Sequence, residues 1–206
     1  MGDAPEPAWR VGESVPWSVA WGGEQDFQLQ KSVLFPGMIE VTQAERPGVG
    51  IPLFAAMHVD RARRGLAEQL CHVCGQPTPP RDRWIFPVAS GGMVTLVDGG
   101  ERYGGNVPPV HEACARRAQR QCPHLKVAMA RPVACPADEG RLIWRTDVVP
   151  GMEALARSFP VGLEVVMSCY RLYGEAFSRK VARLRREEAA RARTRASQDL
   201  GRKPAP

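Results

Sequence analysis

The sequence lacks several features that would assign it to a broad class of protein. No run of apolar residues approaches the roughly 18 that a membrane span needs. The N-terminus, MGDAPEPAWR, lacks the basic and then apolar plan of a secretory leader, and Glu6 stands where a myristoylation signal carries Ser or Thr. We therefore expect a cytoplasmic location, where thiols stay reduced and disulfides are disfavoured.

Motifs of common enzyme classes are also missing. The chain has no glycine-rich phosphate loop, no His-Glu-x2-His helix and no Gly-x-Ser-x-Gly elbow. We expect a protein without catalytic residues, without an organic cofactor and without a small-molecule substrate.

Excess charge is missing from most of the chain. Residues 1–173 hold 18 basic and 18 acidic side chains, whereas residues 174–206 hold the other 10 basic and 4 acidic ones. The last segment therefore carries the whole net charge of +6. Arginine outnumbers lysine 24 to 4, which we attribute to codon usage in GC-rich DNA.

Turn-forming residues, in contrast, are abundant, with 20 Gly and 19 Pro. The predicted fold class is α+β, with a turn-rich core over residues 27–173. We expect an extended Trp-, Pro- and Gly-rich arm over 1–26, whose indoles pack on a neighbouring part of the chain. A basic helical tail with a disordered end is expected over 174–206.

Hydrophobic periodicity and turn residues predict the elements of the core. The stretch 163–173 fits both a strand and a helix, and Gly174 favours a strand that stops there. The remaining predicted elements are two strands over 27–41 broken at Pro36-Gly37, a helix over 58–70 with Arg61, Arg63 and Arg64 facing mostly outward, strands over 84–88 and 93–97 paired as a hairpin about 90–92, a helix from Pro109 to Pro123, a short helix at about 151–159 and a helix over 175–196.

Two pairs of metal-ligating residues flank the predicted hairpin. Cys71 and Cys74 lie in CHVCGQPTPP, and His111 and Cys114 lie in VHEAC. Zinc takes four sulfur or nitrogen ligands, and residues three apart can face one ion from a tight turn or from a helix. The spacing predicts a zinc site on these four residues. With every position filled by protein, the ion would be structural.

Alternative interpretations of the two pairs stay open. Nickel or copper accepts the same ligand types, and four unlinked residues in a turn-rich core is the plainest alternative. A thioredoxin-type redox pair is disfavoured, because the cysteine pair precedes Pro-Thr-Pro-Pro instead of opening a helix.

Other cysteines and histidines are given structural roles. Cys122, His124 and Cys135 would make a second metal site only with a fourth ligand that is not evident, so we interpret Cys122 as a helix-end core thiol. We expect Cys169 to be a buried thiol and His72 to be solvated. His58 is expected to start a helix.

The order of a turn with two cysteines (Cys71 and Cys74), a hairpin and a helix resembles the treble-clef family of zinc fingers over residues 71–125. The segments CHVCGQP and PVHEACARRAQRQCPHL are also similar to uncharacterised small proteins of actinobacteria and their phages. The resemblance implies a treble-clef fold and leaves activity open. A treble-clef nuclease of the His-Asn-His type would need a histidine in the hairpin, and residues 75–110 contain none.

The tail carries basic side chains on a helix whose apolar stripe ends at Leu184. One interpretation is a contact with the phosphate backbone of DNA or RNA. The other is a solvated helix end in which Glu187 and Glu188 pair with arginines. No aromatic residue follows Phe177, so base stacking by the tail is not suggested. The candidate nucleic-acid residues are Arg179, Lys180, Arg183, Arg185, Arg186, Arg191, Arg193 and Arg195.

The leading hypothesis is therefore a non-enzymatic zinc protein that touches nucleic acid through its basic tail. The alternative is a protein–protein interaction or structural accessory module of a phage or its host. The tryptophan-rich arm and the lack of a reactive site suggest this second hypothesis.

Overall fold

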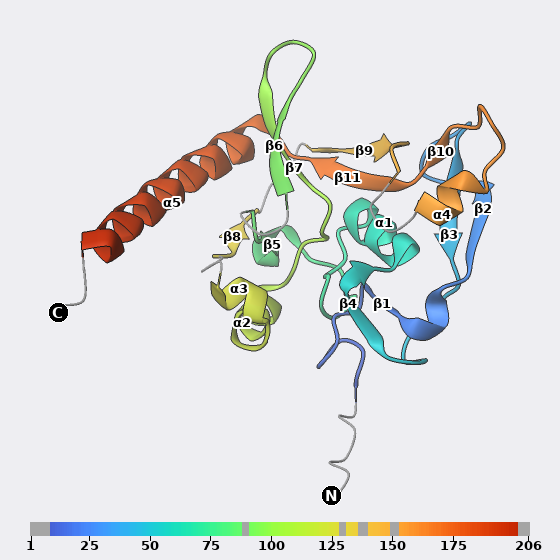
Figure 1. Cartoon of the computed structure of the whole chain (residues 1–206), viewed down its shortest axis with the longest axis horizontal. Coiled ribbons are helices and arrows are strands. Elements are labelled where there is room, and N and C mark those ends of the chain that lie inside the picture. Colours follow the sequence, from blue (N-terminus) through green and yellow to red (C-terminus); the bar gives the residue numbers. More distant parts are fainter. Residues whose placement is uncertain (1–8, 88–90, 128–130, 136–139, 149–152, 202–206) are drawn as a thin grey trace, which may run out of the picture.

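The computed structural model describes residues 9–87, 91–127, 131–135, 140–148 and 153–201 (Figure 1). These residues form a mixed α+β structure, as predicted. The helices are α1 (Val59–Ala67), α2 (Glu112–Gln121), α3 (Pro123–Val127), α4 (Glu153–Arg157), α5 (Glu175–Gly201) and the 3-10 turns η1 (Gly22–Glu24) and η2 (Pro80–Asp82). No helix in this described part has both the length and the apolar character that crossing a bilayer would take.

The described strands form several small sheets. Their orders are β1-β4, β10-β3-β2, β6-β7-β11-β9 and β5-β8. The strands are β1 (Val19–Trp21), β2 (Phe27–Lys31), β3 (Ile39–Gln43), β4 (Pro52–Met57), β5 (Trp84–Ile85), β6 (Gly91–Thr95), β7 (Glu101–Gly105), β8 (Val133–Ala134), β9 (Arg141–Arg145), β10 (Val165–Val166) and β11 (Ser168–Leu172).

The strand pair predicted over 27–41 is confirmed. β2 and β3 pair antiparallel, and the chain reverses through Gly37, which has a φ of 85° that glycine adopts without strain. The strand interpretation of 163–173 is also confirmed, since β10 pairs with β3 and β11 joins the four-stranded sheet. The helix that follows, α5, starts as expected and runs past residue 196 to Gly201.

The predicted pairing of 84–88 with 93–97 is wrong. β5 pairs with the distant β8, and β6 pairs with β7. The β6–β7 turn lies at Asp98-Gly99, where Gly99 has a φ of 79° and the Gly100 N–H donates to Asp98 Oδ1 at 2.8 Å. An Asp-Gly pair supplies the positive φ that a tight hairpin needs. Residues 88–90, where part of the turn was expected, lie outside the described residues.

The predicted helix over 58–70 is present as α1, but its arginines do not all face outward. Arg61 and Arg63 are only 1% and 4% exposed, whereas the side chain of Arg64 is half-exposed. Arg61 donates from both terminal nitrogens to Glu24 at 2.7 Å, and Arg63 lies 3.0 Å from Glu40. These carboxylates come from η1 and β3, so the pattern within the helix could not reveal them.

The helices after the hairpin differ in detail from the predictions. α2 begins at Glu112, with His111 as its N-cap, rather than near Pro109. Pro123 ends α2 as expected and also opens α3. α4 falls within the predicted 151–159, of which residues 151 and 152 lie outside the described residues.

Residues 9–26, which we expected to form an extended arm, run along the core. β1 pairs with β4, and Trp21 is 1% exposed. The rings of Trp9 and Phe54 meet edge to face with centroids 5.5 Å apart. The opposite end of the chain behaves differently, because α5 packs its first turns through Phe177 and then extends away from the other elements (Figure 1).

Candidate metal centre

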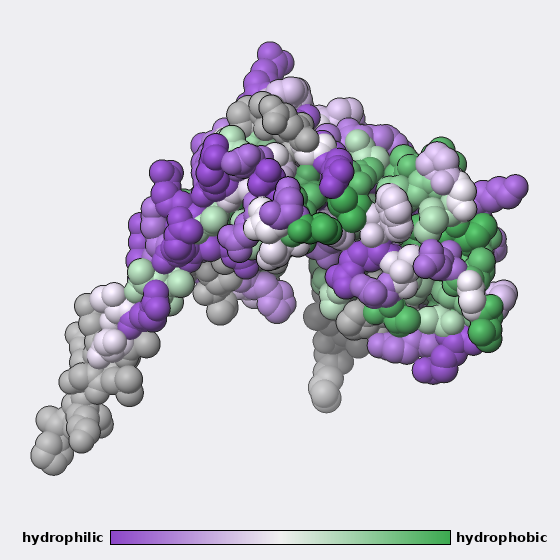
Figure 2. Space-filling model, turned by 90° about the horizontal axis from the view of Figure 1, so that it is seen from above, coloured by the Kyte–Doolittle hydropathy of each residue, from purple (hydrophilic) through white to green (hydrophobic). Residues whose placement is uncertain are grey.

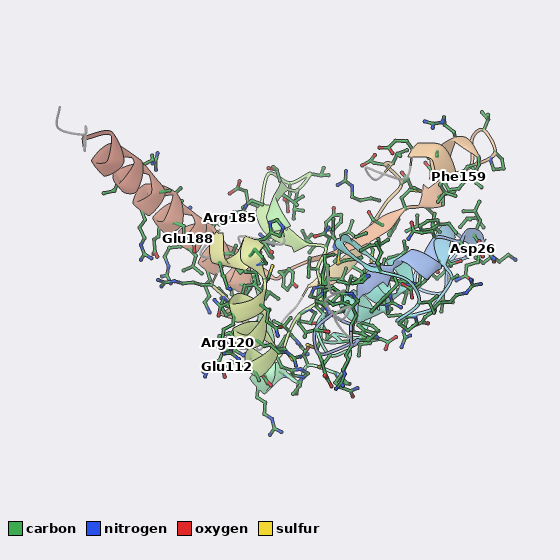
Figure 3. All side chains as sticks on the ribbon, turned by 60° about the horizontal axis from the view of Figure 1, so that its bottom comes forward. Asp26, Glu112, Arg120, Phe159, Arg185 and Glu188 are labelled. Carbon is green, nitrogen blue, oxygen red and sulfur yellow. The ribbon has the colours of Figure 1, made fainter. Side chains whose placement is uncertain are left out.

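The structure brings the four predicted metal ligands together. One ligand atom from each of Cys71, Cys74, His111 and Cys114 lies within 4.8 Å of all the others. Cys71 and Cys74 come from the turn after α1, and Cys114 comes from the first turn of α2, the helix that carries Glu112 and Arg120 in Figure 3. In the described part of the chain, this is the one group of three or more His, Cys, Asp or Glu with such geometry.

The orientation of His111 suits metal ligation. Its Nε2 lies 3.0 Å from the carbonyl oxygen of Pro77, which can only accept a hydrogen bond, so Nε2 carries the proton. The unprotonated Nδ1 then points into the cluster, 3.4 Å from Cys74 Sγ. A backbone carbonyl that holds the outer ring nitrogen is a common way to orient a metal-bound imidazole.

The thiols are held where free thiolates would be costly. Burial raises the pKa of Cys71 to about 12, although hydrogen bonds from the backbone of Cys74 and His111 oppose the rise. Burial, followed by the nearby charge of Cys74, also raises the pKa of Cys114. A divalent cation reverses this situation, because it stabilises the deprotonated sulfurs that would otherwise repel one another.

The donor set fits zinc. Tetrahedral zinc with bonds of about 2.3 Å to sulfur and 2.0 Å to nitrogen places two sulfurs roughly 3.8 Å apart and a sulfur and a nitrogen roughly 3.5 Å apart. Cys74 Sγ and His111 Nδ1 are 3.4 Å apart, close to the second value, and the four ligand atoms need only small shifts from their separations of at most 4.8 Å. Three thiolates and one imidazole would fill all four positions.

The turn that carries the first cysteine pair requires glycine at its end. The Gly75 N–H donates to the Cys71 carbonyl at 2.8 Å, and Gly75 has a φ of 75°. A Cβ at this position would meet the ring of Trp17 at 2.8 Å. Trp17 therefore covers the turn, and its backbone N–H donates to the Val73 carbonyl at 2.8 Å.

Sequence reasoning missed several residues that support the centre. Arg117 donates to the Gly12 carbonyl at 2.7 Å and lies 3.9 Å from Cys114 Sγ. Pro77 orients His111, and Trp17 covers Gly75. Arg117 lies three residues after Cys114, so the helical spacing alone predicts that the two side chains are close. No feature near the cysteines in the sequence predicts that Trp17 and Gly12 lie beside them.

The prediction that His72 is solvated is wrong. Its Nδ1 hydrogen-bonds with the Ser18 hydroxyl, and burial lowers its pKa to about 4. Its position beside Ser18 ties the cysteine turn to the N-terminal segment.

The remaining cysteines and histidines lie outside the cluster. Cys122 is the C-cap of α2, so its place at the helix end is confirmed, but it is half-buried and not the core thiol that we expected, and His124 is exposed. Cys135 and Cys169 are buried, and burial raises the pKa of Cys169 to about 11. His58 is the N-cap of α1.

The basic residues predicted on the tail lie on α5, and most are exposed. Arg179 and Arg183 pair with Glu175 and Glu187 one turn away, at 2.6 and 3.8 Å. Arg185 is half-buried and donates to the Gly91 carbonyl at 3.0 Å. The exposed members are Arg179, Lys180, Arg183, Arg186, Arg191 and Arg193, and the side chain of Arg195 lies outside the described residues.

Comparisons with protein families, with curated proteins and with solved structures returned no match to this chain. We therefore infer the function from the residues themselves, and above all from the Cys3His cluster and the exposed arginines of α5.

Proposed function

We propose that the chain is a non-enzymatic zinc protein whose metal is structural and whose helix α5 contacts nucleic acid. The observation that carries the metal half of the proposal is the closed donor set of Cys71, Cys74, His111 and Cys114. Four protein ligands leave no position for a water or a substrate, which is the arrangement of structural zinc. The role of such an ion is to hold the turn after α1 against α2.

The resemblance to treble-clef zinc fingers supports the same conclusion. The first ligand pair lies in a cysteine turn and the second at the start of a helix, as in that family. Strands lie between them, although β6 and β7 join β11 and β9 in a larger sheet. We infer a treble-clef-like module whose hairpin also forms half of a four-stranded sheet.

Elemental analysis tests the metal. Protein purified without chelator should contain one equivalent of zinc, and Cys74→Ser should lower this below half an equivalent. Cys122→Ser is the matched control, because Cys122, like Cys74, is half-buried, but it lies at the end of α2 and outside the cluster. Chelation should unfold residues 71–121 cooperatively, since structural zinc contributes on the order of 10 kcal/mol. Metal-free wild-type protein with unchanged stability would refute this half of the proposal.

The exposed arginines of α5 support the nucleic-acid half. Arg186, Arg191 and Arg193 lie on the part of the helix that extends beyond the core (Figure 1). Closely spaced cations on one exposed helix attract a phosphate backbone, because binding releases condensed counterions. Intrahelical pairs with Glu175 and Glu187 engage Arg179 and Arg183 only at the surface, where an ion pair is weak.

Binding to a random duplex at two salt concentrations tests this half. Arg186→Gln with Arg193→Gln should weaken binding and lower the salt slope by roughly 0.9 for each phosphate that the helix no longer neutralises. Arg64→Gln with Arg116→Gln is the control, since it removes the same charge from exposed positions on other helices. Equal affinities of the two double variants, or no binding by the wild type, would contradict the proposal.

One observation favours a protein partner as a second candidate. Trp9, Ile51 and Phe54 are 41%, 70% and 55% exposed beside strand β4. Apolar side chains gathered in this way mark interaction surfaces. If this candidate is right, wild-type protein captures a protein partner from nuclease-treated lysate and Phe54→Ser does not. Recovery of nucleic acid alone from untreated lysate counts against it.

A further inference from the structure

The four-stranded sheet β6-β7-β11-β9 has one covered face. On that face Leu142 and Cys169 pack with Leu66 of α1, and Tyr103 packs with Phe177 of α5. The antiparallel registers fix which residues point the other way, because directly paired residues share a face and neighbours alternate.

The opposite face is open. It is hollowed to a volume of about 630 Å³, lined among others by Gly92, Val94, Gly104, Ser168 and Tyr170. Figure 2 shows apolar areas over the body of the molecule on the surface seen from above and hydrophilic residues along the side toward α5. The registers assign to this face Gly92, Arg102, Gly104, Arg141, Arg145 and Tyr170. Leu172 points the same way but is only 5% exposed, so the face is covered at the end of β11.

The ring of Tyr170 packs directly against Gly104 of β7. A Cβ on Gly104 would come 3.2 Å from the Tyr170 ring and 3.1 Å from Val94, so the ring rests close to the bare backbone of β7. The ring is only half-buried, and within the described residues its hydroxyl has no hydrogen-bond partner. A planar group can therefore stack on the ring without displacing another element.

The charged strand positions of the open face are all arginines, namely Arg102, Arg141 and Arg145. Arg141 and Arg145 are exposed, and Arg102 is half-buried. Two of them have acidic neighbours at the surface, since Arg102 lies 3.4 Å from Glu175 and Arg145 lies 2.7 Å from Asp147, which also lines the hollow. Such exposed ion pairs are weak and leave the arginines able to contact phosphate. This face is complementary to a polyanion that also presents flat rings.

The basic helix adjoins the same sheet. Arg185 of α5 donates to the carbonyl of Gly91, the first residue of the edge strand β6, and Figure 3 marks Arg185 on the part of α5 near this hairpin. β9 and β6 are the two edge strands of the sheet, and α5 contacts the β6 edge through Arg185. A single strand lying across the sheet would meet arginines at both ends.

From these contacts we propose that the open face of this sheet binds single-stranded nucleic acid. A base stacks on Tyr170 above Gly104, and the phosphates lie against Arg102, Arg141 and Arg145, with the chain continuing toward α5. Stacking requires a base free of its complementary strand, so this site selects a single strand over a duplex. The inference rests on the nucleic-acid half of the proposed function and specifies its ligand.

Fluorescence anisotropy with labelled 15-nucleotide oligo-dT and oligo-U tests the site, with a duplex of equal length as the comparison. Tyr170→Ala should weaken single-strand binding roughly 10-fold, since one stacked base contributes about that much. Tyr170→Trp should restore binding. Duplex affinity should change little in either variant, and the ratio of the dT and U affinities tells DNA from RNA.

Gly92→Val is the second, independent variant. A Cβ on Gly92 meets nothing within 4 Å, and valine favours a strand, so the variant should fold while its side chain fills the hollow. It should weaken single-strand binding as Tyr170→Ala does. Thr95→Val, on the other face of β6, is the matched control and should bind like the wild type.

The outcomes separate this inference from the proposed function. If Tyr170→Ala and Gly92→Val bind the single strand like the wild type while the α5 double variant binds it less, the sheet site is wrong and the role of α5 stands. If the wild type binds neither probe at low salt, both are wrong. A selective loss of single-strand binding in both sheet variants supports the inference.

Discussion

Helices α1 and α5 are both rich in arginine, yet their arginines have opposite surroundings. Arg61 and Arg63 of α1 are 1% and 4% exposed, whereas the side chains of Arg179 and Arg183 of α5 are 73% and 67% exposed. The difference comes from what other elements bring to the helix. α1 receives carboxylates from η1 and β3, whereas Arg179 and Arg183 of α5 pair with Glu175 and Glu187 of their own helix.

Most polar atoms of the buried pairs of α1 have partners, although among the described residues Nε of Arg61 and Nε of Arg63 have none. Burial alone would raise the pKa of Glu24, but the Arg61 guanidinium and the backbone N–H groups of Arg46 and Trp21 lower it further than burial raises it. Arg61 also donates to the Val19 carbonyl at 2.9 Å. A guanidinium in this position is a structural part of the core, because its removal would leave the buried carboxylate of Glu24 without its countercharge.

Removing Arg61 should therefore produce the largest change in stability among the arginines. Arg61→Met leaves the Glu24 carboxylate buried without its partner, which should lower the free energy of unfolding by about 3–5 kcal/mol. Arg64→Met on the same helix should change it by less than about 0.5 kcal/mol, because Arg64 is half-exposed. Urea denaturation measures both, and equal losses would contradict the distinction between buried and exposed arginines.

Acid should destabilise the buried group of His58, Arg61 and Glu24 in two stages. Burial lowers the pKa of His58, and Glu24 also has a lowered pKa, so unfolding takes up protons at each group. The stabilisation is fully present above the ordinary values of 6.5 and 4.5 and is lost as the pH falls through the lower folded values. Thermal melts across this range should show both losses. Glu24→Gln should be less stable near neutrality and should lack the second loss, and an unchanged second loss would assign it to another group.

The exposed pairs of α5 should give the smallest effect. Arg179→Gln removes the pair with Glu175 and should lower stability by about 0.3–0.5 kcal/mol at low salt. The difference should vanish in about 1 M salt, where screening is strong. Chemical denaturation at both salt concentrations measures it, and a loss that persists in high salt would mean that Arg179 does more than form a surface ion pair.

The metal ligands could be predicted because their geometry is local. Cys71 and Cys74 share a turn, His111 and Cys114 share a helix start, and the two pairs needed only to meet. The burial of Arg61 could not be predicted in this way, since Glu24 lies 37 residues earlier in the chain. The pattern of α1 alone makes these arginines look solvent-facing.

The strands that sequence reasoning missed have a similar cause. β1, β4, β7, β8 and β9 lie in stretches with prolines, glycines and only a few β-branched residues, so their local pattern is that of a loop. They are strands because a partner strand offers unpaired backbone groups, as β11 does for β9. The open sheet face follows from these pairings, and the sequence alone therefore did not indicate Tyr170.

The contact of Arg117 with Gly12 constrains the order of events during synthesis. It joins residues 105 positions apart, and the N-terminal segment also bonds to the cysteine turn through Trp17 and Val73. A nascent chain can close the contact with Val73 once the cysteine turn has emerged, but it cannot close the contact with Arg117 until α2 has left the ribosome. The position of Gly12 is thus completed in two steps, and contacts of such long sequence separation slow folding.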